Sequence, residues 1–390
     1  MTIRTRYLDD CILKDLDEKM VFLGGPRQVG KTTLAVDLIG SHFNTFYFNW
    51  DKIEQRKQAL RGIWPSDSEL IILDEFHKSS KWKTWIKGEY DTHKKKYKFL
   101  LTGSARLDTY RRGGDSLQGR YHYYRLHPFS LAELNGKKTE FDPVNELNFS
   151  VSFSKDNYDS LLKFGGFPEP FIKQSERLLR RWHIERIERF VREDIRDLTM
   201  IQDIGNLGLL LELLPERVSS ILSINSLAQD LQVNFRTISN WLDVFDKLYY
   251  SFRLPPYQSR KIASVRKEKK LYLWDWSSVS DESRGLENMI ASHLLKFCHY
   301  LNDYDGWNTE LYYLRDSMSR ETDFLVTIDK KPWLAIEVKL SDQQLSKNLI
   351  YFKEKLKIPR CYQIVGNMDV DFEKAGIRVM PAAKFLNALV

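Results

Sequence analysis

Short apolar runs alternate with helical stretches over the first third of the chain. The apolar runs cover residues 20–23, 44–50, 70–73 and 97–101. Strands that alternate with helices predict βαβ units and a parallel sheet. The run 70–73 contains no polar residue, as expected for a strand that is covered on both faces, so we place it in the middle of that sheet.

The pattern changes after Pro128. Residues 135–159 are polar and show little periodicity, which is typical of a connecting segment. From 176 to 198 apolar residues recur every three or four positions with Arg and Glu between them, which predicts an amphipathic helix. Helices dominate as far as about residue 248, and strands return at 271–274, 311–314, 324–328 and 333–340. The chain as a whole is predicted to be α/β.

Charge and cysteine content narrow the class of protein only slightly. The formal charge is +7 over 390 residues, which favours an anionic partner such as nucleic acid. Cys11, Cys298 and Cys361 are odd in number and far apart, which fits neither a disulfide framework nor a zinc cluster. The sequence has no uncharged apolar run of about 18 residues and no secretory signal. These features predict a protein of the cytoplasm that has no membrane partner.

Two basic runs, 93–96 and 260–270, are candidate contacts for phosphates. The second run contains six basic residues against one acidic residue, Glu268. Such runs are also common on solvated faces, so both interpretations stay open.

Residues 25–32, Gly-Pro-Arg-Gln-Val-Gly-Lys-Thr, match the P-loop pattern G-x-x-x-x-G-K-[ST]. The motif lies between a predicted strand, 20–23, and a predicted helix, 33–39, which is the context that it requires. Its glycines let backbone N–H groups point inward, Lys31 reaches the terminal phosphates, and the Thr32 hydroxyl ligates Mg²⁺. The expected cofactors are therefore ATP and Mg²⁺. The predicted ATP-binding residues are Gly25, Pro26, Arg27, Gln28, Val29, Gly30, Lys31, Thr32 and Thr33.

An acidic pair closes the apolar run 70–73. Asp74 and Glu75 therefore lie at the carboxyl end of the predicted strand, where ligands gather in open α/β sheets. After a P-loop, this pair predicts a Walker B site in which Asp74 holds Mg²⁺ and Glu75 orients the attacking water. We expect hydrolysis of ATP as well as binding, with Lys31 and Glu75 as catalytic residues.

The next predicted strand, 97–101, leads into Thr102-Gly103-Ser104. A small hydroxyl here would lie beside the acidic pair, and Ser104 is the candidate for contacting the γ-phosphate. The arginines that follow are Arg106, Arg111, Arg112 and Arg120. One of them could stabilise transition-state charge in the same chain or in a neighbouring subunit, and Arg120 is the first choice. A surface or nucleic-acid contact is the alternative for each arginine.

With these residues, the chain resembles a large prokaryotic family of AAA+-type ATPases that carry a C-terminal domain of uncertain function. The segments that carry the resemblance are 25–34, 73–78, 101–105, 127–134 (His-Pro-Phe-Ser-Leu-Ala-Glu-Leu), 165–169 (Gly-Gly-Phe-Pro-Glu), 269–275 (Lys-Lys-Leu-Tyr-Leu-Trp-Asp) and 285–288 (Gly-Leu-Glu-Asn). The resemblance implies an ATPase domain, a helical and winged-helix middle, and a C-terminal domain similar to restriction-endonuclease folds. It implies no substrate.

We therefore expect four regions along the chain. An AAA+-type P-loop domain at 1–135 is followed by a connecting segment and helical region at 136–215. A winged-helix-like region covers 216–268, and an α/β restriction-endonuclease-like domain covers 269–390.

Residues 226–248 predict a helix-turn-helix with its turn at 232–234. If this unit docks on DNA, Arg236, Thr237 and Asn240 would face the major groove, and the basic run 260–270 would contact phosphates. The alternative is a helical bundle that only couples the flanking regions.

The last part of the chain holds three acidic residues and a lysine in a suggestive order. Glu287 lies on a predicted helix, Asp323 on one predicted strand, and Glu337 and Lys339 on one face of the next. Phosphodiester hydrolysis uses such a set, because carboxylates hold metal ions and a lysine stabilises developing charge. The order predicts Glu287, Asp323 and Glu337 as metal ligands and Lys339 as a catalytic residue.

Two functions fit this sequence. In the first, an ATPase cycle controls a Mg²⁺-dependent nuclease that acts on DNA. In the second, an ATP-switched module binds DNA or protein, and its nuclease-like domain is catalytically inactive. DNA is the expected partner besides ATP, and assembly into a homo-oligomer is an open alternative.

Overall fold

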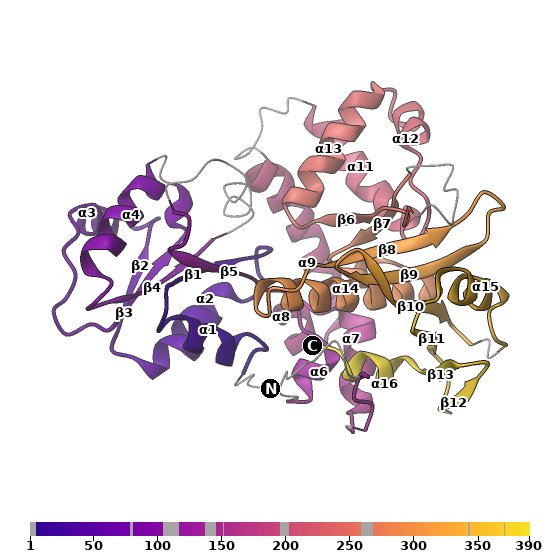
Figure 1. Cartoon of the computed structure of the whole chain (residues 1–390). Coiled ribbons are helices and arrows are strands. Elements are labelled where there is room, and N and C mark those ends of the chain that lie inside the picture. The colour runs from indigo at the N-terminus through magenta and orange to yellow at the C-terminus, as the bar shows by residue number, and fades with distance from the viewer. Residues whose placement is uncertain are drawn as a thin grey trace. The chain divides into compact units, whose positions relative to one another are not determined.

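The computed structural model describes residues 5–78, 81–103, 117–136, 146–150, 152–195, 203–258, 268–341, 344–369 and 371–390 (Figure 1). The chain forms two compact units, Met1–Pro128 and Phe129–Val390. The boundary between them lies close to residue 135, where the sequence predicts the end of the first domain. The boundaries expected at residues 215 and 268 stay predictions. No helix in the described ranges is long and apolar enough to cross a membrane.

The first unit is a parallel sheet that carries helices on both faces. Its strands are β1 (Met20–Gly24), β2 (Thr45–Asn49), β3 (Leu70–Asp74), β4 (Lys98–Thr102) and β5 (Tyr121–Arg125). Its helices are α1 (Asp9–Asp15), α2 (Lys31–Thr33), a π-helical segment (Leu34–Ile39), α3 (Ile53–Leu60) and α4 (Trp82–His93), with short 3₁₀ turns at Gly40–His42 and Phe76–Lys78. The strand order is β2-β3-β4-β1-β5, and every neighbouring pair is parallel.

The core of the first unit explains the strand pattern. Phe22, Leu73 and Leu101 share a core with Trp82 and Ile86 of α4. The opposite face of the sheet is covered by α1 and by the π-helical segment, both of which contribute fully buried residues. β3 is buried at all five positions and lies between β2 and β4, which confirms an interior strand covered on both faces.

The second unit begins with a helical region. Its helices are α6 (Leu131–Leu134), α7 (Lys155–Phe164), α8 (Pro168–Lys173), α9 (Glu176–Arg189), a π-helical segment (Phe190–Ile195), α11 (Ile204–Leu213), α12 (Ile224–Asp230) and α13 (Phe235–Lys247), with a 3₁₀ turn at Leu214–Arg217. A two-stranded antiparallel ribbon follows, made of β6 (Ser251–Leu254) and β7 (Lys270–Leu273). α12 and α13 are the two helices expected on either side of the turn 232–234. The identification of this region as a winged helix stays a prediction.

The chain then forms a six-stranded mixed sheet with helices around it (Figure 1). The elements are a 3₁₀ turn (Trp276–Ser278), α14 (Glu282–Asp303), β8 (Thr309–Arg315), β9 (Glu321–Ile328), β10 (Lys331–Lys339), α15 (Lys347–Leu356), β11 (Arg360–Val365), β12 (Phe372–Lys374), β13 (Ile377–Pro381) and α16 (Ala382–Asn387). The strand order is β12-β13-β11-β10-β9-β8, with β10, β11 and β13 parallel and the other pairs antiparallel. The predicted α/β class is confirmed.

Candidate functional sites

The P-loop links β1 to α2 in the first unit. Gly25 has a φ of 139°, and a Cβ atom there would lie 2.4 Å from the carbonyl oxygen of Leu126, so the position requires glycine. The buried Lys31 ammonium donates hydrogen bonds to the carbonyl oxygens of Gly25 at 3.0 Å and Pro26 at 2.7 Å. The lysine therefore folds back over a loop of the kind whose backbone N–H groups bind phosphates.

Thr32 and Asp74 meet at the end of the sheet that carries the P-loop. The Thr32 hydroxyl donates to Oδ2 of Asp74 at 3.1 Å, and the Tyr47 hydroxyl donates to the same oxygen at 2.8 Å. The Thr102 hydroxyl donates to Oδ1 of Asp74. Hydroxyl and carboxylate oxygens are the hard donors that Mg²⁺ prefers, so the two residues predicted to hold the ion are together and fit it.

Sequence reasoning missed Tyr47, and within Thr102-Gly103-Ser104 it chose Ser104 and not Thr102. Burial raises the pKa of Tyr47, and the hydrogen bond to Asp74 raises it further, so the tyrosine stays a donor. Thr102 is the register partner of Asp74 on one side and of Leu23 on the other, because β4 lies between β3 and β1. Knowledge of the strand order would have identified both residues. Tyr47 lies on β2, which is next to the strand of Asp74, and Thr102 on β4 pairs directly with Asp74.

Glu75 leaves β3 in a left-handed conformation with a φ of 57°. Strained non-glycine backbone of this kind gathers at functional sites. Its N–H donates to the carbonyl oxygen of Thr102 at 3.1 Å. Burial is the largest influence and raises the pKa of Glu75, while the nearby charges of Lys31 and Lys78 act in the opposite direction. Glu75 therefore lies within electrostatic reach of the P-loop lysine.

Lys78 is a further residue that the sequence did not single out. Its ammonium lies 2.7 Å from the carboxylate of Asp51 and 3.9 Å from that of Glu75. The lysine therefore connects the end of β3 to the segment after β2.

The structure corrects the prediction for Arg120 within one chain. Its carbonyl oxygen accepts a hydrogen bond from Met20, the first residue of β1, whereas the P-loop follows the last residue of that strand. The Arg120 guanidinium pairs with Asp91 of α4, with Nε–Oδ1 at 2.8 Å and Nη2–Oδ2 at 3.0 Å. The length of β1, about 16 Å, separates Arg120 from the P-loop of its own chain. A role across subunits stays a prediction.

Ser104 lies outside the described residues, and so do Arg106, Arg111 and Arg112. The proposed contact of Ser104 with the γ-phosphate therefore stays a prediction.

The start of α13 presents polar side chains to solvent. Arg236 and Asn240 are exposed and Thr237 is half-buried, while Ile238 and Trp241 on the other face are buried. Most of the basic run 260–270 falls in the undescribed range 259–267. The described side chains are thus compatible with a helix pair that docks on DNA and with one that only couples the flanking regions.

The predicted C-terminal residues lie on three neighbouring elements, α14, β9 and β10. Nζ of Lys339 is 2.8 Å from Oε1 of Glu337 on the same face of β10. Oδ2 of Asp323 accepts a hydrogen bond from the N–H of Val338 at 2.9 Å, which holds Asp323 against β10. Burial, followed by the charge of Asp323, raises the pKa of both Glu287 and Glu337. The structure therefore brings the three acidic side chains near one another.

Lys270, which opens β7, lies among these carboxylates. Its Nζ is 2.7 Å from Oε1 of Glu321, 3.4 Å from Oδ1 of Asp323 and 3.6 Å from Oε1 of Glu287. Burial by itself would lower the pKa of Lys270, but Glu287, Asp323 and Glu321 raise it above its usual value. The side chain is therefore a buried ammonium. Sequence reasoning counted Lys270 only as part of a basic run and missed Glu321.

The acidic residues of the predicted metal centre are paired with lysines. In the part of the chain that is described, no three Asp, Glu, His or Cys side chains are grouped so that they could hold a metal ion. The physical reason is local: the Lys270 ammonium contacts both Glu287 and Asp323, and Glu337 pairs with Lys339. The residues present do not fit the metal ion that the resemblance implies for this domain.

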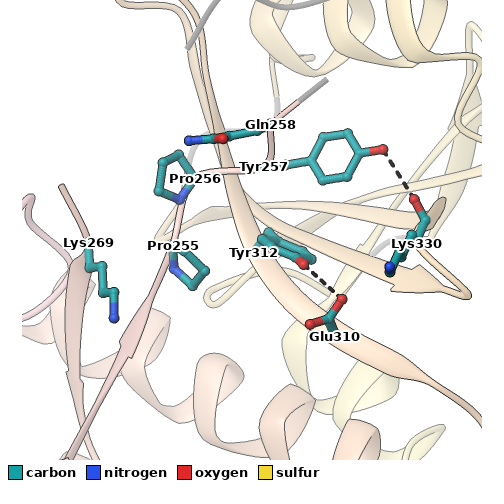
Figure 2. Close-up of a pocket in the computed structure, with 8 residues that line it drawn as sticks. All are labelled: Pro255, Pro256, Tyr257, Gln258, Lys269, Glu310, Tyr312 and Lys330. Carbon is teal, nitrogen blue, oxygen red and sulfur yellow. Dashed lines mark hydrogen bonds between the residues drawn. The ribbon is translucent and has the colours of Figure 1, made fainter. Parts of the chain in front are cut away.

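A pocket of about 590 Å³ opens on the second unit, next to the ribbon β6–β7 (Figure 2). The rings of Tyr257 and Tyr312 meet edge to face, with centroids 5.5 Å apart. The Tyr257 hydroxyl donates to the carbonyl oxygen of Lys330 at 3.3 Å, and the Tyr312 hydroxyl donates to Glu310 at 2.8 Å. The lining residues are Pro255, Pro256, Tyr257, Gln258, Lys269, Glu310, Tyr312 and Lys330.

Residues 17–135 match the family described as AAA domain. This match and the P-loop geometry define the N-terminal part as an AAA-type P-loop ATPase domain. Residues 155–280 and 284–385 match two further families, each described only as a domain of unknown function (DUF8612 and DUF4143).

Comparisons over most of the chain find relatives that are described as uncharacterized. An uncharacterized protein of Methanocaldococcus jannaschii is 24% identical over 340 residues, which cover 74% of this chain and 70% of that protein. An uncharacterized protein of Mycobacterium tuberculosis is 24% identical over 330 residues, which cover 80% of this chain and 69% of that protein. Among solved structures, a Walker-type ATPase of Pyrococcus abyssi is similar with a TM-score of 0.40 and 14% identity, covering 70% of this chain and 93% of that one.

Proposed function

We propose that the protein is a Mg²⁺-dependent ATP hydrolase whose nucleotide cycle acts on a nucleic-acid-binding C-terminal part. The observation that carries the ATPase assignment is the meeting of Lys31, Thr32 and Asp74 at one end of a parallel sheet. A lysine over the loop suits the phosphates, and paired hydroxyl and carboxylate oxygens suit the cation.

Each residue then has a defined task. Bound Mg²⁺ would supply charge neutralisation for the phosphates, and Thr32 and Asp74 would hold it. Glu75 would accept a hydrogen bond from the attacking water and so orient it. Ser104 would contact the γ-phosphate, and Arg120 would act on the phosphates of a neighbouring subunit.

Loss of the P-loop lysine tests the ATPase assignment. Lys31→Ala should lower ATP turnover by about 100-fold or more, because the phosphates lose a positive charge that the loop holds in place. Lys95→Ala is the matched control, since Lys95 is an exposed lysine that precedes β4, at the other end of the sheet. Unchanged turnover in Lys31→Ala, measured as phosphate release, would refute the assignment.

Two features of the second unit support nucleic acid as the partner. The exposed side chains of Arg236 and Asn240 lie at the start of α13, as in a helix that reads a DNA groove. The pocket in Figure 2 combines two tyrosine rings with Lys269 and Lys330, and aromatic rings beside cations suit a stacked base and its phosphate.

Binding of duplex and single-stranded DNA at two salt concentrations tests this partner. Affinity should fall steeply with salt, because basic side chains displace counterions from phosphates. Arg236→Ala should weaken binding, whereas Lys247→Ala, an exposed cation at the other end of α13, should not. Absence of binding at low salt, or equal binding by both variants, would indicate that the helix pair packs against the flanking regions and does not bind DNA.

A second candidate function is cleavage of the bound nucleic acid. The observation in its favour is the pair Glu337–Lys339, in which Nζ of Lys339 lies 2.8 Å from Oε1 of the buried Glu337. The alternative is a domain that binds without cutting. An assay of plasmid and oligonucleotide cleavage in Mg²⁺ or Mn²⁺, with and without ATP, separates the two.

A further inference from the structure

Lys270 is almost completely removed from water although it carries a charge. Its exposed fraction is 2%, and its ammonium lies within 3.6 Å of the carboxylates of Glu287, Glu321 and Asp323. The three acids come from α14 and β9, whereas the lysine comes from β7 of the antiparallel ribbon. The cluster therefore joins the ribbon to the mixed sheet.

Further hydrogen bonds surround this cluster. The Tyr272 hydroxyl donates at 2.7 Å to Oε1 of Glu287, the oxygen that also faces Lys270, and Arg315 donates to Oε2 of Glu321 at 2.7 Å. Oδ2 of Asp323 accepts the N–H of Val338. A buried ammonium and buried carboxylates are each costly alone, and only mutual pairing with further hydrogen bonds offsets that cost.

A divalent cation in this place would need the same oxygen atoms. Oε1 of Glu287 and Oδ1 of Asp323 face Nζ of Lys270, and an ammonium and a metal ion cannot share the space between them. We propose that Lys270 is the resident cation of this cluster, and that Glu287, Glu321 and Asp323 bind a divalent metal ion only when the lysine charge is removed. The ammonium of Lys270 neutralises the charge of these carboxylates, as a bound metal ion would.

The test uses the full chain with Lys31→Ala as the parent, so that the ATP site does not contribute, and Mn²⁺ alone as the probe. The parent should bind no Mn²⁺ through this cluster. Adding Lys270→Met, which keeps the length of the side chain but not its charge, should create one Mn²⁺ site per chain, detected by calorimetry or electron paramagnetic resonance. A further Asp323→Asn change should remove that site.

Lys269→Met is the matched control, because Lys269 is the exposed residue directly before β7 and its loss should create no site. If Lys270→Met does not fold alone, recovery of its folded circular dichroism spectrum in Mn²⁺ supports the proposal, and failure to recover overturns it. Binding of Mn²⁺ by the parent that is lost in Asp323→Asn overturns it too, as does a folded Lys270→Met that gains no site. The inference is independent of ATP hydrolysis and of DNA binding, which are measured in chains that keep Lys270.

Discussion

Asp74 and Glu75 carry the same functional group and are neighbours in sequence, but the fold gives them different surroundings. Asp74 ends β3 and accepts hydrogen bonds from the hydroxyls of Thr32, Tyr47 and Thr102. Glu75 turns away from the strand with a positive φ, and burial raises its pKa. One carboxylate is therefore held by three hydroxyl groups at the strand end, whereas the other lies just beyond the strand in a left-handed conformation.

This difference predicts the behaviour of Glu75→Gln. The variant should bind ATP as tightly as the wild type, because Lys31 and Asp74 are unchanged, but turnover should fall by about 100-fold or more once the carboxylate is lost. Nucleotide affinity and phosphate release would be measured on the same preparation. Glu69→Gln, at the opposite end of β3, is the control and should keep full activity. Wild-type turnover in Glu75→Gln would move the role to another residue.

Among the elements of the second unit, two segments that carry the family resemblance meet at Asp275. Oδ2 of Asp275 is 3.1 Å from Arg186 and 3.3 Å from His183, both on α9. Gly165 has a φ of 75°, and a Cβ atom there would lie 2.8 Å from Oδ1 of Asp275. The ion cluster therefore joins segment 269–275 to α9, and Gly165 of segment 165–169 packs closely against its carboxylate.

Asp275→Ala should lower the free energy of unfolding by about 3–5 kcal/mol, because it leaves the largely buried Arg186 without its carboxylate. Chemical denaturation of wild type and variant at pH 7 would measure the difference. Asp159→Ala on α7, an exposed position, should change stability little.

The pH dependence of this effect has a definite sign. Burial by itself would raise the pKa of Asp275, but His183 and Arg186 hold it well below its usual range. A lowered folded-state pKa stabilises the fold above the unfolded-state value of about 4, and the contribution is lost as the pH falls towards the folded-state pKa. The titration of Asp275 itself should leave the difference in unfolding free energy between wild type and Asp275→Ala constant from pH 7 to pH 5. Below about pH 4 this difference should shrink.

At the scale of the whole molecule, the chain forms two compact units, and the P-loop site lies entirely in the first. Asp323→Ala and Lys339→Ala in the second unit should therefore leave ATP turnover within about twofold of wild type, since the described residues of the ATP site all belong to the first unit. If the second unit cleaves DNA, Lys339→Ala should slow cleavage, because the lysine no longer stabilises developing charge. Loss of ATP turnover in both variants would show that the units depend on each other.

The sequence predicted strands with a clear apolar pattern and missed strands without one. The strands expected at 20–23, 70–73 and 333–340 are present as β1, β3 and β10, because continuous or alternating apolar runs are a local signal. β5 carries Tyr, His and Arg in a run that has no clear apolar pattern, so it was missed. β11 to β13 were missed as well.

The sequence by itself determined the P-loop, the acidic pair that ends β3, and the parallel sheet between them, because each depends on residues that are close along the chain. Only the tertiary structure decided that Tyr47 and Thr102 donate hydrogen bonds to Asp74. It also decided that Arg120 lies at the start of β1, at the other end of that strand from the P-loop. It also decided that Lys270 fills the carboxylate cluster. These contacts join residues far apart in sequence, and the order of strands in a sheet, which spacing along the chain does not encode, sets which of them meet.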